Sequence, residues 1–457
     1  MYLNELDDLE DILDTIIAYD TPTIFTEEYT EDFLECVYEL LDEYMIQNDT
    51  IITEPNFQEI LLSDLIDIYS IQFEDDILKD EIVEEDMINL LEDMVDMYCD
   101  SFIPKRSIEN IAIDTTFHNP TNTNYALIES KINKLRSIPQ PQQRTAEWYA
   151  FRHNLITASN AYKIFESNSM VNQIIYEKCQ PLKVIHEDEP PKLTNVNTTL
   201  HWGQKYEPLS VMIYEEMYGT KVEDFGCIPH NTYKFLGASP DGIIVNQDSN
   251  RYGRMLEIKN IVNREITGIP KKEYWIQMQL QMEVCDLDEC DFLETKFTEY
   301  SDEDSFLKDE IHQNENNENE HKNKYKGVIL YFNTKHNKPF YLYKPLHITN
   351  YDEINTWIEQ QIEVYQQQDM IWIKTIYWKL EKMSCVLVLR NKLWFKNNIL
   401  RIDSIWKTIE KERITGYEHR APNKRVKNIV PKKVEESTPK CLLNINPPKS
   451  TNTTTEN

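Results

Sequence analysis

The uneven distribution of charge is the feature that most limits how this chain can fold. Residues 1–103 contain 32 Asp or Glu and one basic residue, Lys79, so they carry −31 of the formal net charge of −32. The rest of the chain is nearly neutral, with 47 acidic and 46 basic side chains. Charge of one sign at this density needs a solvated surface, so we expect residues 1–103 to form a unit of their own.

The acidic segment also contains enough apolar residues for a core. Phe33, Val37 and Leu41 recur with helical spacing, as do Met87 and Leu91. The pattern therefore predicts a small helical domain with an acidic shell over residues 1–103, rather than an unstructured acidic tail.

A short hairpin is predicted near the middle of the chain. The run at 237–242 is rich in turn-forming residues, contains Asp241, and leads into a β-branched strand. A polar connection then precedes a return strand at 254–260, which contains Glu257. Asp241 and Glu257 are therefore expected near each other at one end of the hairpin.

The return strand places an acidic and a basic residue on one face. Side chains alternate along a strand, so Glu257 and Lys259 face away from Leu256 and Ile258. Taken alone, this pattern is typical of a solvated strand face with an ion pair. A second carboxylate at the turn instead favours a metal centre, because Mg²⁺ binds through one or two carboxylates and a backbone carbonyl, here that of Ile258. Lys259 can then stabilise negative charge on a phosphate during phosphodiester hydrolysis.

Three further motifs accompany this hairpin. In chain order they are Arg144-Thr-Ala-Glu-Trp148-Tyr-Ala-Phe-Arg152 with Ile156-Thr157-Ala158-Ser159, then Trp202-Gly203-Gln204-Lys205-Tyr206-Glu207-Pro208, and finally the expected helix from Tyr274 to Val284. With these blocks in this order, the run from Arg144 to about Asn350 resembles the YqaJ-type viral recombinase and phage lambda exonuclease group of the PD-(D/E)XK nuclease superfamily. The resemblance implies an α/β (α+β) fold of the restriction-endonuclease type, with a central mixed sheet flanked by helices.

The resemblance also implies roles for individual residues. Glu207 would join Asp241 and Glu257 at a site for one or two Mg²⁺ or Mn²⁺ ions. Arg152 and Ser159 would hold the 5′ phosphate of a DNA end, a task that suits the planar guanidinium. A glutamine of the 274–284 helix would hydrogen-bond toward Lys259 and the substrate, with Gln277 as first choice and Gln279 as second. The alternative for Glu207 is a first-turn glutamate that complements a helix dipole just before a proline, and the order of the motifs favours the site.

The remaining segments are assigned by composition. We expect a linker at 104–143 with a short helix at 125–136, a nuclease domain at 144–350 with a mobile insertion at 301–324, and a closing strand pair at 325–331 and 339–343. A helical basic extension at 351–434 and a disordered tail at 435–457 follow.

The basic extension has two interpretations. Trp372, Trp378, Trp394 and Trp406 lie among Lys and Arg, so they could stack on bases, although core packing in a helical appendage is favoured. The basic runs at 424–427 and 432–433 could be a nuclear import signal or a phosphate-binding arm.

Together these features predict a divalent-metal-dependent DNA nuclease. The resemblance implies a 5′-to-3′ exonuclease acting on linear double-stranded DNA ends in recombination or repair, with a single-strand annealing protein and a ring-shaped homo-oligomer as expected partners. A catalytically idle DNA-end binding or scaffold protein, an endonuclease and an RNA-directed nuclease stay open as alternatives. The acidic domain is expected to be a docking or solubilising module, the alternative being a DNA mimic that restrains the nuclease.

The location expected for the protein is intracellular, in the cytoplasm or nucleus of a host cell, with a viral origin as one alternative. The acidic start lacks an apolar run, so no signal peptide and no membrane contact are expected. The eight cysteines show no zinc-binding spacing, which favours reduced thiols.

Overall fold

The structure is a computed structural model that describes residues 27–77, 81–109, 125–141, 145–182, 195–309 and 325–422. The expected tail at 435–457 and the basic runs at 424–427 and 432–433 lie outside these residues.

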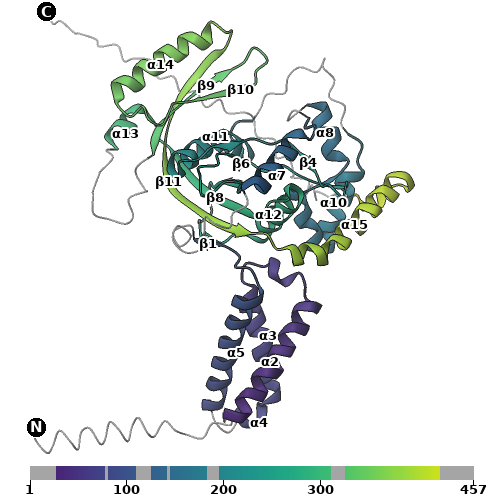
Figure 1. The fold of residues 1–457 in the computed structure, drawn as a ribbon. Helices are drawn as coiled ribbons and strands as arrows, with labels where there is room; N and C mark the ends of the chain where they lie inside the picture. Colours follow the sequence, from purple (N-terminus) through teal and green to yellow (C-terminus); the bar gives the residue numbers. More distant parts are fainter. Residues whose placement is uncertain are drawn as a thin grey trace, which may run out of the picture. The chain divides into compact units, whose positions relative to one another are not determined.

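The acidic segment is helical, as its apolar spacing predicts. Helices α2 (Glu27–Gln47), α3 (Phe57–Gln72) and α5 (Glu81–Phe102) pack side by side, with the one-turn helices η1 (Ile51–Thr53) and α4 (Glu74–Ile77) between them (Figure 1). Val37, Leu61 and Leu91 are among the fully buried side chains of this bundle. Acidic residues occupy the outer positions, so hydrophobic burial and charge solvation are satisfied together.

A large mixed sheet forms the centre of the remaining chain and confirms the predicted fold class. Its strand order is β10 (Pro339–Tyr343), β9 (Lys326–Asn333), β11 (Ile371–Leu389), β8 (Glu289–Glu299), β7 (Met255–Asn260), β6 (Gly242–Ile244) and β3 (Val222–Glu223), with β1 (Ile108–Glu109) also paired to β11. Only β7 and β8 pair in parallel in this sheet. A parallel pair needs a crossover connection, and α12 (Lys272–Cys285) supplies it.

Two helices cover opposite faces of the sheet at β7. Met255 packs in the same core cluster as α12, whereas Leu256 and Ile258 pack with Tyr214 of α11 (Thr199–Tyr218). The predicted alternation along residues 254–260 is thus confirmed, and both faces of the strand are covered.

A second, smaller layer lies beside α12. It consists of the three-stranded sheet β2 (Ile156–Thr157), β5 (Leu236–Ala238) and β4 (Ile228–Pro229), with helices α8 (Ala146–His153), α9 (Ala158–Ala161), η2 (Tyr162–Phe165) and α10 (Asn168–Cys179). Helix α7 (Tyr125–Ser137) matches the short helix expected within the linker.

The segment after residue 350 differs from the expected helical extension. Helices α14 (Tyr351–Gln366) and α15 (Lys392–Thr415) do form, with η4 (Glu418–Arg420) after them, but residues 371–389 between them are the strand β11. β11 lies between β9 and β8, so it belongs to the central sheet. Trp378, Trp394 and Trp406 are buried, as the core interpretation predicts, whereas Trp372 is 40% exposed.

Two other expectations can be compared with the structure. The closing strand pair forms as β9 and β10, in antiparallel register. The insertion at 301–324 contains the helix α13 (Glu303–Lys308) where a mobile loop was expected, and residues 310–324 lie outside the described part. Among the helices that are described, none is long and apolar enough to cross a membrane.

Candidate active site

A cavity of about 270 Å³ brings together residues from five separate stretches of the chain. Its lining residues are Arg152, Thr157, Ala158, Ser159, Glu207, Ser239, Asp241, Glu257, Ile258, Lys259, Gln277 and Gln281. Every site residue predicted from the sequence lines this cavity, with the exception of Gln279.

Asp241 directly precedes β6 and is held against β7. Its backbone N–H donates to the Leu256 carbonyl at 3.2 Å, and its Oδ2 accepts from the Ile258 N–H at 2.7 Å. The following residue, Gly242, lies so close to β3 that a Cβ there would be 2.1 Å from Val222 Cγ1. The antiparallel pairing of β6 with β7 confirms the predicted hairpin.

Glu257 is buried in β7, and both of its carboxylate oxygens accept hydrogen bonds. Gln277 Nε2 donates to Oε1 at 2.7 Å, and Gln281 Nε2 donates to Oε2 at 2.7 Å. Lys259 Nζ forms an ion pair with Oε1 and lies 3.4 Å from Gln277 Oε1. With Glu257 only 1% exposed, this is not the solvated ion pair that the short motif alone would suggest.

Arg152 enters the cavity from the last turn of α8. This helix begins at the N-cap Thr145, whose side chain accepts from the Trp148 N–H at 3.2 Å. The Arg152 guanidinium lies 4.6 Å from the centre of the Trp148 ring, and its Nη1 is 3.4 Å from Ser239 Oγ. Trp148 therefore orients a cation whose outer donors face the cavity.

Glu207 reaches the cavity from the middle of α11, which differs from the helix start that was expected. The helix begins earlier because the Thr198 side chain caps it by accepting from the His201 N–H at 3.1 Å. Pro208 then lies inside the helix, where it removes one backbone donor. Nearby, Asn260 Nδ2 donates to the Gly203 carbonyl at 3.0 Å, which connects this part of α11 to β7.

The charges in the cavity influence one another strongly. Burial raises the pKa of Asp241 well above its usual range, and the negative charges of Glu257 and Glu207 raise it further, against the opposing effects of Lys259 and the Ile258 N–H. Burial favours the neutral amine of Lys259, but Glu257 and Asp241 outweigh it and raise the pKa of Lys259. The ionised site thus contains more negative charge than its single lysine offsets.

This donor set fits a hard divalent cation. Asp241, Glu257 and the Ile258 carbonyl would hold it, with Glu207 as a further carboxylate at the same cavity. Within the described residues, no three carboxylate, histidine or cysteine side chains are grouped closely enough to hold a metal by themselves. Mg²⁺ suits such a site because it usually retains several waters. A bound cation would also relieve the repulsion that raises the pKa of Asp241.

The prediction for the glutamines of α12 is wrong at one position. The Gln279 side chain is 1% exposed and bonds away from the cavity, since Nε2 donates to the Leu389 carbonyl at 2.9 Å and Oε1 accepts from the Asn391 N–H at 2.6 Å. Gln281, which was not predicted, faces the cavity instead and bonds to Glu257. Helical spacing in the sequence could have identified Gln281, because residues 277 and 281 are four apart and lie on the same helix face, whereas residue 279 does not.

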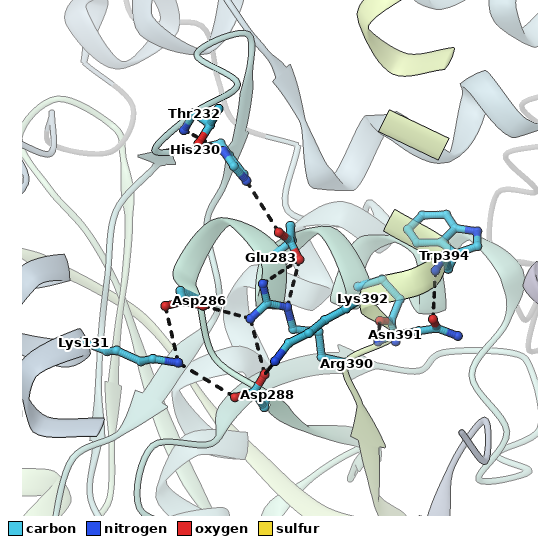
Figure 2. Close-up of polar contacts among 11 residues, drawn as sticks. Lys131, His230, Thr232, Glu283, Asp286, Asp288, Arg390, Asn391, Lys392 and Trp394 are labelled. Atoms are coloured by element: carbon cyan, nitrogen blue, oxygen red, sulfur yellow. Dashed lines mark hydrogen bonds and ion pairs between the residues drawn. The ribbon is translucent and has the colours of Figure 1, made fainter. Parts of the chain in front are cut away.

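The far end of α12 is fixed by a second set of charges, drawn in Figure 2. Arg390, at the end of β11, donates from Nε to Glu283 Oε2 at 2.9 Å and from Nη1 to Asp286 Oδ1 at 3.0 Å. Lys131 of α7 lies 3.4 Å from Asp286 Oδ2. These contacts join α12 to two other elements, which limits how far Gln277 and Gln281 can move relative to Glu257.

The part of the chain that forms this cavity is similar to a known protein family. Residues 147–288 match the YqaJ-like viral recombinase domain, which confirms the resemblance over that range. An uncharacterized protein of Acanthamoeba polyphaga mimivirus is 29% identical over 321 residues, which is 62% of this chain. The same alignment covers 55% of the viral protein, so this chain spans about half the length of that relative.

Two crystal structures of LHK-Exo, an alkaline exonuclease of Laribacter hongkongensis, are also similar, one of them a complex with dAMP. Each match covers 59% of this chain and 94% of the exonuclease, at 17% identity and a TM-score of 0.33. At this TM-score the match gives no correspondence between individual residues.

Proposed function

We propose that this chain, whose residues 147–288 match the YqaJ-like viral recombinase domain, is a divalent-metal-dependent DNA nuclease. Its activity would be 5′-to-3′ exonucleolytic, on linear double-stranded DNA ends in recombination or repair. The observation that carries the proposal is the cavity itself, which places Asp241, Glu257 and Lys259 beside Arg152 and Ser159.

Each side of the cavity would have a separate task. Asp241, Glu257, the Ile258 carbonyl and Glu207 would hold Mg²⁺ or Mn²⁺. A bound ion would lower the pKa of its water and offset charge on the scissile phosphate. Lys259 would donate hydrogen bonds to the phosphate oxygens as negative charge develops, and Gln277 and Gln281 would keep the Glu257 carboxylate in a fixed orientation.

Arg152 and Ser159 would bind the terminal 5′ phosphate. A guanidinium can donate two parallel hydrogen bonds to a phosphate, and stacking on Trp148 presets its plane. A phosphate site within the same small cavity as the carboxylates favours a DNA end over an internal stretch of duplex. Strand polarity, a ring-shaped oligomer and an annealing partner are supported by the family resemblance alone.

One observation favours a second candidate, a protein that binds DNA ends without cutting them. Glu257 already accepts from Lys259, Gln277 and Gln281, so a metal would have to share its oxygens with three donors. A site held in this way could bind a phosphate through Arg152 and Lys259 and perform no chemistry.

The deciding experiment uses the full chain with Mg²⁺ and three DNA substrates: linear 5′-phosphorylated, linear dephosphorylated and closed circular. Lys259→Ala tests the site, and Lys221→Ala is the matched control, since Lys221 is 69% exposed and pairs with Glu215. We expect fastest loss of 5′-phosphorylated linear DNA, no loss of circles, and at least a hundredfold slower cleavage by Lys259→Ala only.

The other outcomes are equally informative. Cleavage of circles would show an endonuclease. Retention of 5′-phosphorylated ends without cleavage at any metal concentration would favour the end-binding candidate. Undiminished cleavage by Lys259→Ala would refute the assignment of the cavity.

A further inference from the structure

The outer part of the central sheet is covered by different helices on its two faces. Val328, Leu330 and Phe332 of β9 point toward α14, which covers one face (Figure 1). The alternate residue Tyr331 therefore points to the opposite face, the side on which α11 packs.

On this second face, three strands align aromatic and basic side chains in one row. Tyr341 of β10 is directly opposite Tyr331 of β9, which in turn is opposite Lys374 of β11. The two tyrosine rings lie 5.1 Å apart with an interplanar angle of 31°. Their hydroxyls are held, because the Tyr341 Oη contacts His201 Nε2 at 2.6 Å and the Tyr331 Oη donates to Asn333 Oδ1 at 3.2 Å. Both rings are partly exposed, and the hydroxyl bonds fix their positions.

The charge around this row is unusual for so acidic a chain. Residues 325–350 and 370–380 contain six lysines and no acidic residue. Three of the six are not part of this surface, because Lys326 and Lys379 bond to Asp309 on the face covered by α14 and Lys344 is buried. Lys374 is exposed and, among the described residues, forms no ion pair. The β9–β10 turn adds the exposed Lys335 and Lys338 at the outer end of the same two strands.

The row continues toward the cavity. Tyr343 lies two residues beyond Tyr341 on β10, and its Oη donates to the Lys205 carbonyl of α11 at 2.5 Å. Lys205 is two residues before Glu207 in α11, and Glu207 lines the cavity, so the row ends beside the turn of α11 that carries a cavity residue. A strand bound along β10 would therefore extend to the candidate active site.

We propose that Tyr331, Tyr341 and Lys374 form a binding site for single-stranded DNA. Bases would stack on the two rings, and phosphates would contact Lys374 and the basic turn, as in surfaces that bind single strands without sequence preference. The proposal rests on the proposed nuclease function only for the source of the strand, since binding itself needs no cleavage.

The test measures binding of a fluorescent oligothymidylate by anisotropy, in EDTA, with the full chain. We expect Tyr331→Ala to weaken binding by about tenfold, which is within the effect of losing one stacked base. Tyr331→Phe should stay within about twofold of wild type, because the ring is retained. Lys374→Ala should weaken binding and lower its salt dependence by about one released ion, whereas Lys221→Ala should change neither.

Binding by Tyr331→Ala and Lys374→Ala that equals wild type would overturn the proposal. So would equal losses in Tyr331→Phe and Tyr331→Ala, because the hydroxyl bond to Asn333 would then be what matters. If Tyr331→Ala fails to fold, the exposed Lys374 decides alone. The two proposals fail separately: a chain that cuts no DNA but loses oligonucleotide binding in these variants refutes the nuclease and supports the strand site.

Discussion

Gln281 and Glu257 are joined by a 2.7 Å hydrogen bond from Nε2 to Oε2, across the space between α12 and β7. The same amide nitrogen donates to the Ser239 carbonyl at 3.1 Å, just before the turn that carries Asp241. Gln281 thus contacts β7, which carries Glu257, and the segment just before Asp241. Its position makes it a candidate for holding the two acidic residues in a fixed relation.

The three glutamines of α12 allow a matched comparison. We expect Gln277→Leu and Gln281→Leu each to lower kcat/KM for cleavage by about ten- to a hundredfold, because a hydrogen bond to a charged group contributes about 1.5–3 kcal/mol. Gln279→Leu should leave kcat/KM near wild type and instead destabilise the fold by about 1–3 kcal/mol, since it leaves the Leu389 carbonyl and the Asn391 N–H without partners.

Initial cleavage rates and denaturant unfolding of the three variants check this prediction. A Gln281→Leu variant that cuts as fast as wild type would show that Gln277 and Lys259 suffice to orient Glu257. A rate loss in Gln279→Leu that persists well below its unfolding transition would contradict the division between the two faces of α12.

Much of this arrangement follows from local pattern in the sequence. Helical spacing is set within one segment, so Val37 and Leu91 could be placed in the core of an acidic bundle. The hairpin was equally local, because a Pro-Asp-Gly turn and a β-branched run decide it within a few residues. Local pattern could not show burial. The alternation of Glu257 and Lys259 with apolar residues is typical of a solvated strand face, and Glu257 becomes enclosed only because α12 packs over it.

The long strand β11 does not follow from local pattern. Its β-branched residues are interrupted by lysines, and its pairing partners β8 and β9 lie far earlier in the chain. Non-local pairing, rather than local preference, therefore decides its conformation. The four tryptophans were grouped by composition, yet Trp378 lies on a strand and Trp394 on a helix.

Asp241→Asn should stabilise the metal-free protein while abolishing cleavage. The folded-state pKa of Asp241 lies above its unfolded value, so its favourable contribution exists only at low pH and is lost as pH rises through the folded-state pKa. Asparagine keeps an oxygen for the Ile258 N–H but carries no charge. In EDTA at neutral pH we expect a gain of about 1 kcal/mol, as seen when a strained functional residue is relaxed.

Metal addition supplies the control for this prediction. Mg²⁺ should stabilise wild type and leave Asp241→Asn nearly unchanged, since ligand binding to the folded state adds stability. At subsaturating Mg²⁺, cleavage should rise with pH, and more Mg²⁺ should move the rise to lower pH, because metal and protons compete for the carboxylate. Thermal melts that show no metal effect on wild type would contradict the metal assignment.

The free energy of unfolding should increase with pH in mildly alkaline solution, because Lys178 is buried. Its Nζ donates to the Arg152 carbonyl at 2.7 Å, and burial, helped by the charges of Arg152 and Arg413, lowers its pKa from 10.5 to about 8. Between these values the unfolded chain binds more protons, so the free energy of unfolding rises with pH. Relative to Lys178→Met, wild type should gain on the order of 2 kcal/mol between pH 7.5 and pH 10.

Lys344 offers an independent check at another site. Burial lowers its pKa to about 8 as well, so the comparison with Lys344→Met should show the same trend. Denaturant unfolding at several pH values measures both. Parallel pH curves for wild type and the two methionine variants would contradict the prediction.

Arg390 should contribute more to stability than the exposed lysine beside it. Its side chain is 8% exposed, and Nη2 lies 2.7 Å from Glu283 Oε2, which is itself 15% exposed. Arg390→Met leaves that carboxylate without its guanidinium, and we expect a loss of about 3 kcal/mol. Lys392→Met is the matched control: its ammonium is 67% exposed and pairs with Asp288 at 3.0 Å, so its removal should cost less than about 1 kcal/mol.

The pH dependence of the stability difference between wild type and Arg390→Met tests whether the charge of Arg390 causes it. Burial alone would raise the pKa of Glu283, but His230 and Arg390 outweigh it and the pKa is lowered. A lowered folded-state pKa gives stability that is present above the unfolded pKa of 4.5 and is lost as pH falls through the folded value. The gap between wild type and Arg390→Met should therefore be full at pH 6 and shrink in acid. A gap that stays constant to pH 3 would mean that Arg390 acts through packing at the end of α12 and not through charge.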